Sequence, residues 1–330
     1  MGAMDKHSRE LFNDTILAEA SQRFALTILE PLDGFENQIF AGQIGDQKVA
    51  LRIAHDLHRT PDMVQGEIEW INYLAEHGVS VPWTLPSQKG QMVEVIPAAD
   101  GSLFSAVAFS WAPGRPPRRE DWEAGLLREV GRLLGRMHHL TRQFSPSTPR
   151  RCRPDMLSEA ADFEQYLPLV EPVVSERYLE TVRHLQGLPM PDDAYGLIHQ
   201  DAHGGNFFVQ DGKITIFDFD DCLYGWFVHD LAMAWMYVLP LDCRSPAQIE
   251  FARQSLGELL EGYAHEYVLP SHWLPEIPVF LKLREIDLYI AIHRSLDLNN
   301  LDPWCARFME NRRTKIETRQ PFVDLDWSKL

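Results

Sequence analysis

The sequence is poor in cysteine and has no long apolar run. Its four cysteines are widely scattered without a CxxC pair, which excludes a disulfide-stapled scaffold and indicates reduced thiols. The longest apolar stretch, LAMAWMYVLPL at 231–241, is interrupted by Pro240 and is shorter than the ~18 residues of a membrane span. The opening MGAMDKHSRE has no apolar signal-peptide core. We therefore expect a cytoplasmic protein without a membrane partner.

Positive charge is also scarce. The chain has 31 lysines and arginines against 48 aspartates and glutamates, a formal net charge of −17. A protein that neutralises nucleic-acid phosphates presents a basic face, so this balance argues against a nucleic-acid partner. It favours cationic or metal-bound ligands only weakly, because a solvated acidic surface has the same composition. No repeat or low-complexity tract is present, and nothing indicates an oligomeric state.

The length of the chain and a local change in its composition predict two lobes. At 330 residues it exceeds the usual size of one compact domain, and 45% apolar with 24% charged residues is ordinary for a globular protein. The run APGRPPRRED at 112–121 contains three prolines, a glycine and three arginines. We place the boundary there, with an N-terminal lobe at 1–113 and a C-terminal lobe at 114–330.

Hydrophobic periodicity separates these lobes by structural class. The first contains a polar helical opening at about 8–22, strand-like apolar runs and a helix that begins at Pro61-Asp62 and ends at Gly78. The expected strands are 25–31, 37–44, 47–54, 93–97 and 103–111. Beyond the boundary, apolar residues recur at helical spacing in 120–141, 226–238, 247–266 and 276–298. The pattern predicts an α+β fold with a small antiparallel sheet in the N-terminal lobe and a mainly helical C-terminal lobe.

The stretch LIHQDAHGGNFFVQDGKITIFDFDD at 197–221 concentrates acidic residues among strand-forming ones. Two apolar pieces flank a polar loop, and the Asp211-Gly212 turn joins the second piece to the alternating KITIFDF as a hairpin. This arrangement is expected to bring Asp201 and Asn206 close to Asp218. Oxygen ligands from a loop and a strand end are typical of Mg²⁺ sites, where substrate phosphates complete the coordination.

These motifs resemble those of a known family. HQDAHGGN, followed twelve residues after its asparagine by the first aspartate of IFDFDD, is similar to the catalytic signature of the aminoglycoside phosphotransferase and choline kinase superfamily. The resemblance extends to FENQIF at 35–40, VALRI at 49–53, QGEIEWINYLAEHGVSVP at 65–82, SWAPGRP at 110–116 and HDLAMAW at 229–235. It implies a bilobal protein-kinase-like fold and transfer of the γ-phosphoryl group of ATP to a hydroxyl of a small molecule.

The resemblance also implies roles for residues of the C-terminal signature. Asp201 would accept or orient the proton of the substrate hydroxyl, and Asn206 and Asp218 would hold Mg²⁺. Asp220, two residues after Asp218, is open: it could reach the same metal, cap a helix or pair with an arginine. Asp230 is expected to cap a helix or to pair with the catalytic loop.

In the N-terminal lobe the resemblance points to nucleotide contacts. Asn37 lies in the segment similar to the nucleotide-covering hairpin, and Ser110 lies in the segment similar to the inter-lobe hinge. The phosphate-binding base is usually lysine, but VALRI offers Arg52, with Lys48 as an alternative. Arginine can fork onto phosphate oxygens, although its geometry differs from that of an ammonium group. Glu67 is the expected partner of this base.

Two other functions compete with a kinase. His199, Asp201 and His203 alternate and could place three ligands on one face of a strand, as in a metal-dependent hydrolase. Arg52 in place of lysine also suits a non-catalytic nucleotide-binding pseudokinase.

The identity of the acceptor is open. For a kinase, the resemblance allows an amino alcohol, an aminoglycoside, homoserine or a sugar-like acceptor, and the negative charge favours a cationic one. Tyr224 and Trp226 are candidate pocket residues in an expected loop. The charged residues of 281–300 either line the acceptor pocket or form a solvated helix face.

Overall fold

The computed structural model describes all of the chain except residues 1–5, 33, 35, 124, 150–152 and 328–330. Phe35 of the expected nucleotide hairpin and Cys152 therefore lie outside the described residues. The chain forms two compact units. The first comprises Met1–Gly114, Phe144–Arg153 and Thr215–Asp220, and the second comprises Arg115–Gln143, Pro154–Ile214 and Asp221–Leu330.

The first unit is built on an antiparallel six-stranded sheet with the order β1-β2-β3-β6-β4, in which β5 also pairs with β6. Its strands are β1 (Thr27–Leu32), β2 (Gln38–Ile44), β3 (Gln47–His55), β4 (Thr84–Leu85), β5 (Glu94–Pro97) and β6 (Leu103–Ser110). Its helices are α1 (Lys6–Leu11), α2 (Asp14–Arg23) and α3 (Pro61–Glu76). The expected opening helix at 8–22 is thus two helices, because the Asn13 side chain caps the second one at Thr15 N and Ile16 N.

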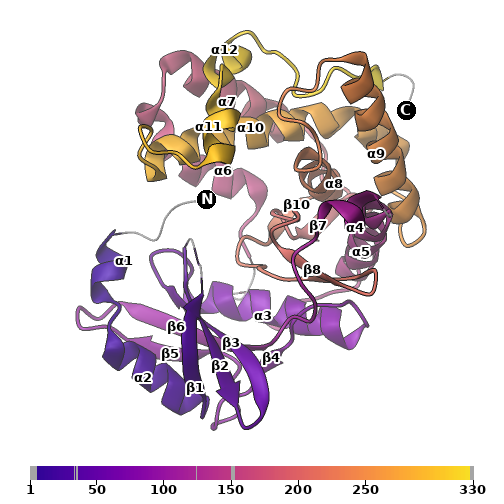
Figure 1. Ribbon diagram of the computed structural model, residues 1–330. Helices are drawn as coiled ribbons and strands as arrows, with labels where there is room; N and C mark the ends of the chain where they lie inside the picture. Colours follow the sequence, from indigo (N-terminus) through magenta and orange to yellow (C-terminus); the bar gives the residue numbers. More distant parts are fainter. Residues whose placement is uncertain (1–5, 33, 35, 124, 150–152, 328–330) are drawn as a thin grey trace. The chain divides into compact units, whose positions relative to one another are not determined.

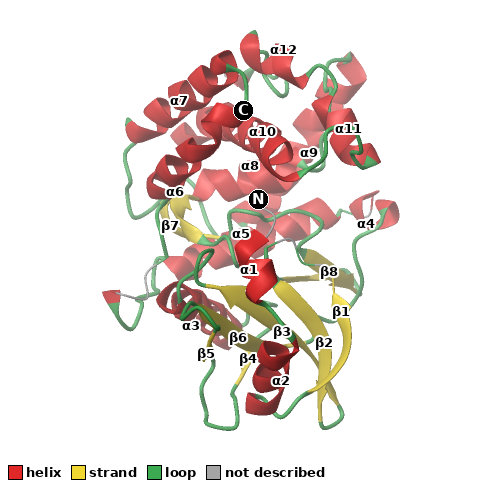
Figure 2. Cartoon of the chain, turned by 90° about the vertical axis from the view of Figure 1, so that its left-hand side faces the viewer, coloured by secondary structure: helices red, strands yellow, loops and turns green. Residues whose placement is uncertain are grey.

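The two faces of the sheet carry different chemistry. Ile16 of α2 and Phe24, which follows this helix, pack with Leu51 and Ile53 of β3 in a buried apolar cluster. Figure 2 shows α2 lying across the strands. Because side chains alternate along a strand, Arg52 lies on the opposite face from these two β3 residues. The sequence of one strand therefore supplies both a core face and a buried cation.

The second unit is mainly helical. Its helices are α4 (Arg119–Glu123), α5 (Leu126–Thr141), α6 (Met156–Phe163), α7 (Pro172–Gln186), α8 (Phe227–Met236), α9 (Pro246–Ala264), α10 (Ile277–Ser295), α11 (Pro303–Met309) and α12 (Arg312–Glu317), with 3-10 turns η2 (Glu164–Leu169) and η3 (Ser271–Glu276). Strand β7 (Tyr195–Ile198) pairs with β10 (Leu223–Trp226), and β8 (Phe207–Gln210) pairs with β9 (Lys213–Ile216), which continues into the first unit. The predicted α+β class is confirmed.

Helices α5 and α9 lie side by side (Figure 1) and approach each other through glycines. A Cβ on Gly131 would lie 2.0 Å from the Leu259 carbonyl oxygen, and one on Gly135 would lie 2.6 Å from that of Tyr263. A larger residue at either position would push the helices apart. Gly125, in contrast, precedes α5 with a φ of +91°, so the expected helix at 120–141 is divided into α4 and α5.

Strand β10 and the burial of Trp226 differ from the sequence-based expectations. Tyr224 and Trp226 lie on strand β10, which was expected to be a loop. Trp226 is fully buried and donates its indole N–H to the Pro189 carbonyl at 2.8 Å, so it is a core residue and not a pocket residue. Within the described residues, no helix combines the length and the apolar character needed to cross a bilayer.

Candidate active site

The loop at residues 199–206, HQDAHGGN, follows β7 in the second unit and is held by a buried carboxylate. Asp230, within the first turn of α8, accepts hydrogen bonds from the backbone N–H groups of His199 at 2.9 Å and Gln200 at 2.8 Å. Gln200 has a φ of +70°, so these bonds support a strained turn. Burial alone would raise the pKa of Asp230, but the hydrogen bond with His138 and the charges of His138, His199 and His229 together outweigh burial and lower the pKa. Asp230 therefore pairs with this loop and does not serve as an N-cap.

Asp201 in this loop is buried and ionised. Its Oδ2 accepts a hydrogen bond from Asn206 Nδ2 at 3.0 Å and lies 3.3 Å from His203 Nε2, while Oδ1 pairs with the Arg284 guanidinium. Burial would raise the pKa of Asp201, but the Arg284 charge, together with His203 and His199, outweighs burial and the pKa falls far below its ordinary range. A carboxylate of such low basicity can orient a hydroxyl by accepting its hydrogen bond, but it is a weak general base.

Arg284 was not expected in this position. It lies on α10, 83 residues after Asp201, and is only 7% exposed. Its Nη2 and Nε also donate to the Tyr237 hydroxyl, at 2.8 and 3.2 Å. Glu285 beside it is 1% exposed and pairs with Arg312 at 2.6 Å. These two residues therefore belong to the interior of the second unit, which excludes the solvated-face interpretation for this part of α10.

A pocket of about 720 Å³ opens beside the same loop, within the second unit. Its wall includes His203, Gly204 and Gly205 of the loop, together with aromatic and apolar side chains and the carboxylate of Glu258. The other lining residues are Pro117, Arg119, Trp122, Leu127, Tyr237, Val238, Phe251, Gln254 and Ser255. The pocket can therefore hold an organic molecule next to the loop that carries Asp201.

The first unit places a buried ion pair on the second face of its sheet. Arg52 on β3 and Glu67 on α3 form two parallel hydrogen bonds, Nη1 to Oε1 at 2.7 Å and Nη2 to Oε2 at 2.6 Å, and Glu67 is fully buried. Lys48 is exposed, with its ammonium 3.7 Å from the centre of the Trp111 ring. Glu69, two residues along α3, accepts hydrogen bonds from Ser147 instead. The structure thus pairs Glu67 with Arg52 and not with Lys48.

The two aspartates after β9 differ in exposure. Asp218 has a φ of +66° and an exposed side chain, and its charge contributes to the raised pKa of Arg52. Asp220 is buried, with Oδ2 2.5 Å from His58 Nε2 and Oδ1 3.6 Å from Arg52 Nη1. Of the three alternatives for Asp220, the structure shows pairing with cations. Asp218 is the one that presents its carboxylate outward.

His58 connects this network to the expected nucleotide hairpin. Its Nε2 also lies 2.8 Å from Glu36 Oε2. Burial lowers the pKa of His58, but the Asp220 and Glu36 carboxylates raise it to about 10, so the imidazole is a cation at neutral pH. The backbone carbonyl of Asp220 accepts further hydrogen bonds from Arg59 Nε at 3.1 Å and from Arg153.

The remaining nucleotide candidates, Asn37 and Ser110, are both buried. Asn37 Oδ1 has no hydrogen-bond partner within the described part of the chain, whereas Ser110 Oγ accepts from the Trp83 N–H at 3.1 Å. The structure thus brings Asp201 together with Asn206 in the second unit, and Arg52 with Glu67 near Asp218 in the first. The roles of all these residues in the reaction stay predictions.

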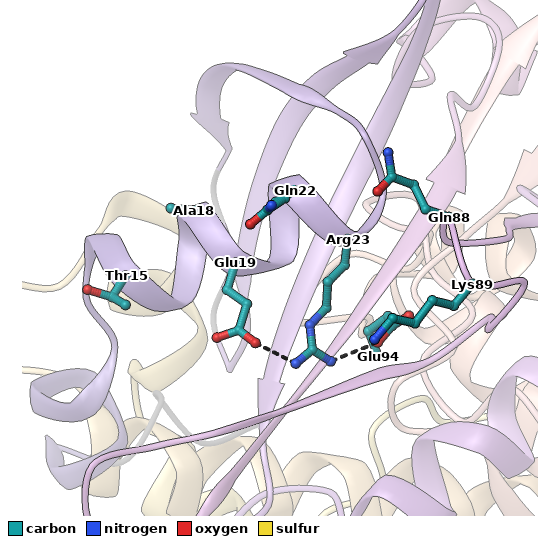
Figure 3. A pocket seen from close by; sticks show the side chains of 8 residues that line it. All are labelled: Thr15, Ala18, Glu19, Gln22, Arg23, Gln88, Lys89 and Glu94. Carbon is teal, nitrogen blue, oxygen red and sulfur yellow. Dashed lines mark hydrogen bonds and ion pairs between the residues drawn. The ribbon is translucent and has the colours of Figure 1, made fainter.

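A second pocket, of about 500 Å³, lies in the first unit away from these residues. Figure 3 shows Arg23 of α2 between Glu19 and Glu94, with Lys89 beside Glu94. The Arg23 guanidinium is 2.7 Å from Glu94 and also pairs with Glu19. Because two carboxylates already neutralise this arginine, the pocket is better explained as an ion-paired contact of α2 with β5 than as an anion site.

The histidines do not form the metal site that the hydrolase hypothesis needs. His199 is fully buried, and its Nδ1 accepts a hydrogen bond from the Asp201 N–H at 3.3 Å. His203 Nδ1 accepts from the Gly205 N–H at 2.9 Å. Among the described residues, the side chains of His199, Asp201 and His203 do not converge as a set of metal ligands. Both histidines instead shape the loop around Asp201.

Known proteins match almost the whole chain. The model of the phosphotransferase enzyme family matches residues 27–271. Amicoumacin kinase of Bacillus subtilis (strain 168) is 33% identical over 334 residues, covering 98% of both proteins. Among solved structures, amicoumacin kinase hAmiN in complex with AMP-PNP, Ca²⁺ and Ami has a TM-score of 0.88 and 30% identity, covering 99% of both chains.

A solved structure of lower sequence identity has the same fold. A microcompartment-associated aminopropanol kinase has a TM-score of 0.72 at 19% identity, covering 92% of this chain and 95% of that one. The fold is therefore that of protein-kinase-like small-molecule kinases, as predicted. Family match and full-length similarity agree that this chain belongs to the phosphotransferase enzyme family and is a small-molecule kinase with an alcohol group as acceptor.

Proposed function

We propose that this enzyme transfers the γ-phosphoryl group of ATP, as its Mg²⁺ complex, to a hydroxyl of a small organic molecule. The observation that carries the proposal is the geometry of Asp201: a buried, ionised carboxylate fixed by Asn206 and Arg284 beside a pocket large enough for an organic acceptor. In phosphoryl transfer, positioning and electrostatics supply most of the rate enhancement, so a fixed carboxylate is the group such a reaction needs.

Asp201 is proposed to accept the hydrogen bond of the acceptor hydroxyl and so aim its oxygen lone pair at phosphorus. The bond from that oxygen to the γ-phosphorus forms as the bond from phosphorus to the β,γ-bridging oxygen breaks, and ADP leaves with the bonding pair. The low pKa of Asp201 favours orientation over early proton removal. The hydroxyl proton is then lost late, as the phosphate ester forms.

Arg52 is proposed to contact ATP phosphates from its position opposite Glu67. Its forked ion pair with Glu67 fixes the plane of the guanidinium group. The intact pair supports a catalytic enzyme over a pseudokinase. Asn37 and Ser110 remain proposed nucleotide contacts.

The donor atoms fit a hard divalent cation. The Asn206 amide donates from its Nδ2 to Asp201, and no described residue donates to its Oδ1, so this oxygen can bind a cation. The Asp218 carboxylate is exposed. Carboxylate and amide oxygens are the ligands that Mg²⁺ and Ca²⁺ take. Bound with the nucleotide, the cation would neutralise charge on the phosphates. The hAmiN complex with AMP-PNP and Ca²⁺ supports a nucleotide and a divalent cation for this chain; the preference for Mg²⁺ is our proposal.

The acceptor is proposed to be an amicoumacin-like or amino-alcohol compound, with aminoglycosides, homoserine and sugar-like molecules as further candidates. Similarity over the full length to amicoumacin kinase supports the first. A screen of these acceptors with Mg-ATP, read by mass spectrometry for a phosphorylated product, tests the proposal. We expect one acceptor class to be phosphorylated, and Asp201→Asn to lower kcat about 1,000-fold without changing the melting temperature by more than a few degrees.

Two outcomes would contradict the proposal. One is Asp201→Asn turning over at the wild-type rate, which would remove the assigned role of that carboxylate. The other is tight Mg-ATP binding with no phosphorylated product from any acceptor class, including amicoumacin itself. Asp218→Asn provides an independent check, because loss of a metal ligand should raise the Mg²⁺ concentration needed for half-maximal rate.

A further inference from the structure

A buried hydrogen-bond network in the second unit connects Tyr263 of α9 with the loop that carries Asp201. Tyr263 is 2% exposed, and its hydroxyl oxygen lies 2.8 Å from Nδ1 of His138 on α5. Nε2 of His138 lies 3.2 Å from Asp230 Oδ2, and both residues are fully buried. Asp230 in turn accepts the backbone N–H groups of the two residues before Asp201. Three side chains from three helices therefore lead to the loop at residues 199–206.

The packing of α5 against α9 and α8 fixes the geometry of this network. Helix α5 approaches α9 at Gly135, where an added Cβ would lie 2.6 Å from the Tyr263 carbonyl oxygen. The His138 ring, one turn further along α5, is nearly parallel to the Phe227 ring of α8, with 4.3 Å between the ring centres. The Tyr263 ring meets the imidazole edge-on at 5.6 Å. Because these aromatic contacts hold the imidazole, its two nitrogens can exchange partners only by disrupting the packing.

The position of each proton in the network follows from the donors and acceptors at its ends. The pKa of Asp230 is lowered, so its carboxyl group is ionised and only accepts hydrogen bonds. Nε2 of His138 must therefore carry a proton. The Tyr263 hydroxyl bonds to no described residue other than His138, and a buried donor without an acceptor is costly. Every N–H and O–H group of the network has a partner only if His138 is neutral, with its proton on Nε2 and with Nδ1 accepting from Tyr263.

We propose that Tyr263 is a positioning residue for phosphoryl transfer: it selects the Nε2–H tautomer of His138 and so keeps Asp230 bonded to the loop. This inference rests on the proposed role of Asp201. In the other tautomer a lone pair on Nε2 would face the carboxylate, and repulsion would replace the hydrogen bond. Asp230 also supports the strained turn at Gln200, so a displaced Asp230 would move Asp201 out of line with the acceptor hydroxyl. A partner on one ring nitrogen commonly sets which nitrogen of a histidine carries the proton.

The tautomer can be measured in the wild type without any substitution. Long-range ¹H–¹⁵N correlation spectra of protein labelled with ¹⁵N-histidine report which ring nitrogen carries the proton. The His138 signals are those that are missing from the spectrum of His138→Gln. At pH 8 we expect a proton on Nε2 and none on Nδ1. A proton on Nδ1, alone or together with one on Nε2, would overturn the inference, because Tyr263 could not then donate to that nitrogen.

Tyr263→Phe removes the hydroxyl group and keeps the aromatic ring. With the acceptor of highest turnover in the screen, we expect kcat to fall about 10-fold because Asp201 is misplaced, with KM for ATP unchanged. The His138 spectrum should show a proton on Nδ1. Tyr178→Phe on α7 is the matched control, since its hydroxyl is also buried and donates to the Ala160 carbonyl at 3.0 Å. The control should keep kcat, and an equal kcat for the two variants would assign Tyr263 to the fold alone.

His138→Gln separates selection of a tautomer from a general loss of packing. The glutamine amide has N–H donors for Asp230 and no tautomers, so the Tyr263 hydroxyl no longer decides where a proton lies. Tyr263→Phe should therefore lower kcat about 10-fold in the wild-type background and less than about 2-fold in the His138→Gln background. The same factor in both backgrounds would show that Tyr263 acts independently of His138 and that the inference is wrong.

The failures of the two proposals are distinguishable. If Asp201→Asn keeps the wild-type turnover, the proposed role of Asp201 fails whichever tautomer the spectra show. If Asp201→Asn loses turnover and Tyr263→Phe keeps it, the role of Asp201 stands and positioning by Tyr263 is wrong. The spectrum of the wild type needs no variant of Tyr263, so it decides the tautomer even if Tyr263→Phe does not fold.

Discussion

Two buried aspartates, Asp220 in the first unit and Asp201 in the second, are both paired with cations but are held in different ways. Asp220 is fixed by its side chain, through His58, and by its backbone carbonyl, through Arg59 and Arg153. Asp201 is fixed through its carboxylate, by Arg284 from α10 and by Asn206, and its backbone carbonyl accepts bonds from Asn206 and His203 of its own loop.

The difference indicates two purposes. Bonds to a backbone carbonyl from arginines of distant segments tie the chain to the rest of the unit, so the network around Asp220 holds the segment that carries Asp218. Bonds to carboxylate oxygens fix only the direction of a side chain, which is what a group that orients a hydroxyl requires. Changes in the first network should therefore affect mainly stability, and changes around Asp201 should affect mainly turnover.

The largest effect is expected from Glu67→Ala in the first unit. This change leaves the buried Arg52 without its forked partner and with only the more distant Asp220 carboxylate, 3.6 Å away. Breaking a buried ion pair typically costs about 3–5 kcal/mol. Urea unfolding should show this loss, and turnover should fall with it because Arg52 is no longer fixed. Glu69→Ala on the same helix should cost less than about 1 kcal/mol, since its partner Ser147 is exposed. Equal losses for the two variants would contradict the importance of the buried pair.

In the second unit, Arg284→Lys should reduce turnover more than stability. Lysine keeps the charge but cannot donate in a fork to both Asp201 and the Tyr237 hydroxyl. We expect kcat to fall about 10- to 100-fold, with KM for ATP unchanged. Arg294→Lys on the same helix, where the guanidinium lies over the Tyr166 ring, is the matched control and should keep kcat. A stability loss without a change in kcat would assign Arg284 to the fold alone.

Sequence patterns predicted these two regions unequally. Alternation and turn residues located five of the six strands in the sheet of the first unit, all but the two-residue β4, and the spacing of HQDAHGGN located Asp201 and Asn206. These segments were recognisable because their patterns are local along the chain. Arg284 was not located, since its partner is 83 residues away and the buried residues of α10 are not confined to one face. On such a helix no periodicity distinguishes an inward charge from a solvated one. Strand β10 was missed for a related reason: LYGW is short, and its pairing with β7 is not local.

Alkaline pH should weaken the network around Asp220 while leaving the charge of Asp201 unchanged. The pKa of His58 in the folded protein is raised to about 10 from an ordinary value of 6.5. The contribution of protonated His58 to the free energy of unfolding is therefore complete below pH 6.5. It is lost as the pH rises toward 10, at up to ~1.4 kcal/mol per pH unit for one proton. Asp201, whose pKa is lowered, stays ionised throughout this range. Urea unfolding at pH 6, 8 and 9.5 should show the decline in the wild type and a flatter profile in His58→Gln.

The smallest effect is expected at Asp287 of α10, where the substitution should stabilise the protein instead of weakening it. Asp287 is half-buried, and no hydrogen bond or ion pair joins its side chain to another residue that the structure describes. The pKa of Asp287 in the folded protein is about 7 against an ordinary 3.8. The contribution of this carboxyl group to the free energy of unfolding is therefore complete below pH 3.8, and it is lost as the pH rises through 7, where the ionised carboxylate becomes a penalty to the fold. Asp287→Asn removes this penalty and should be more stable than the wild type by about 1 kcal/mol at pH 8, with no gain near pH 4. Arg284, which faces Asp287 from the same helix, limits the gain. Thermal unfolding at the two pH values measures it, and Asp162→Asn at an exposed position of α6 should show no difference.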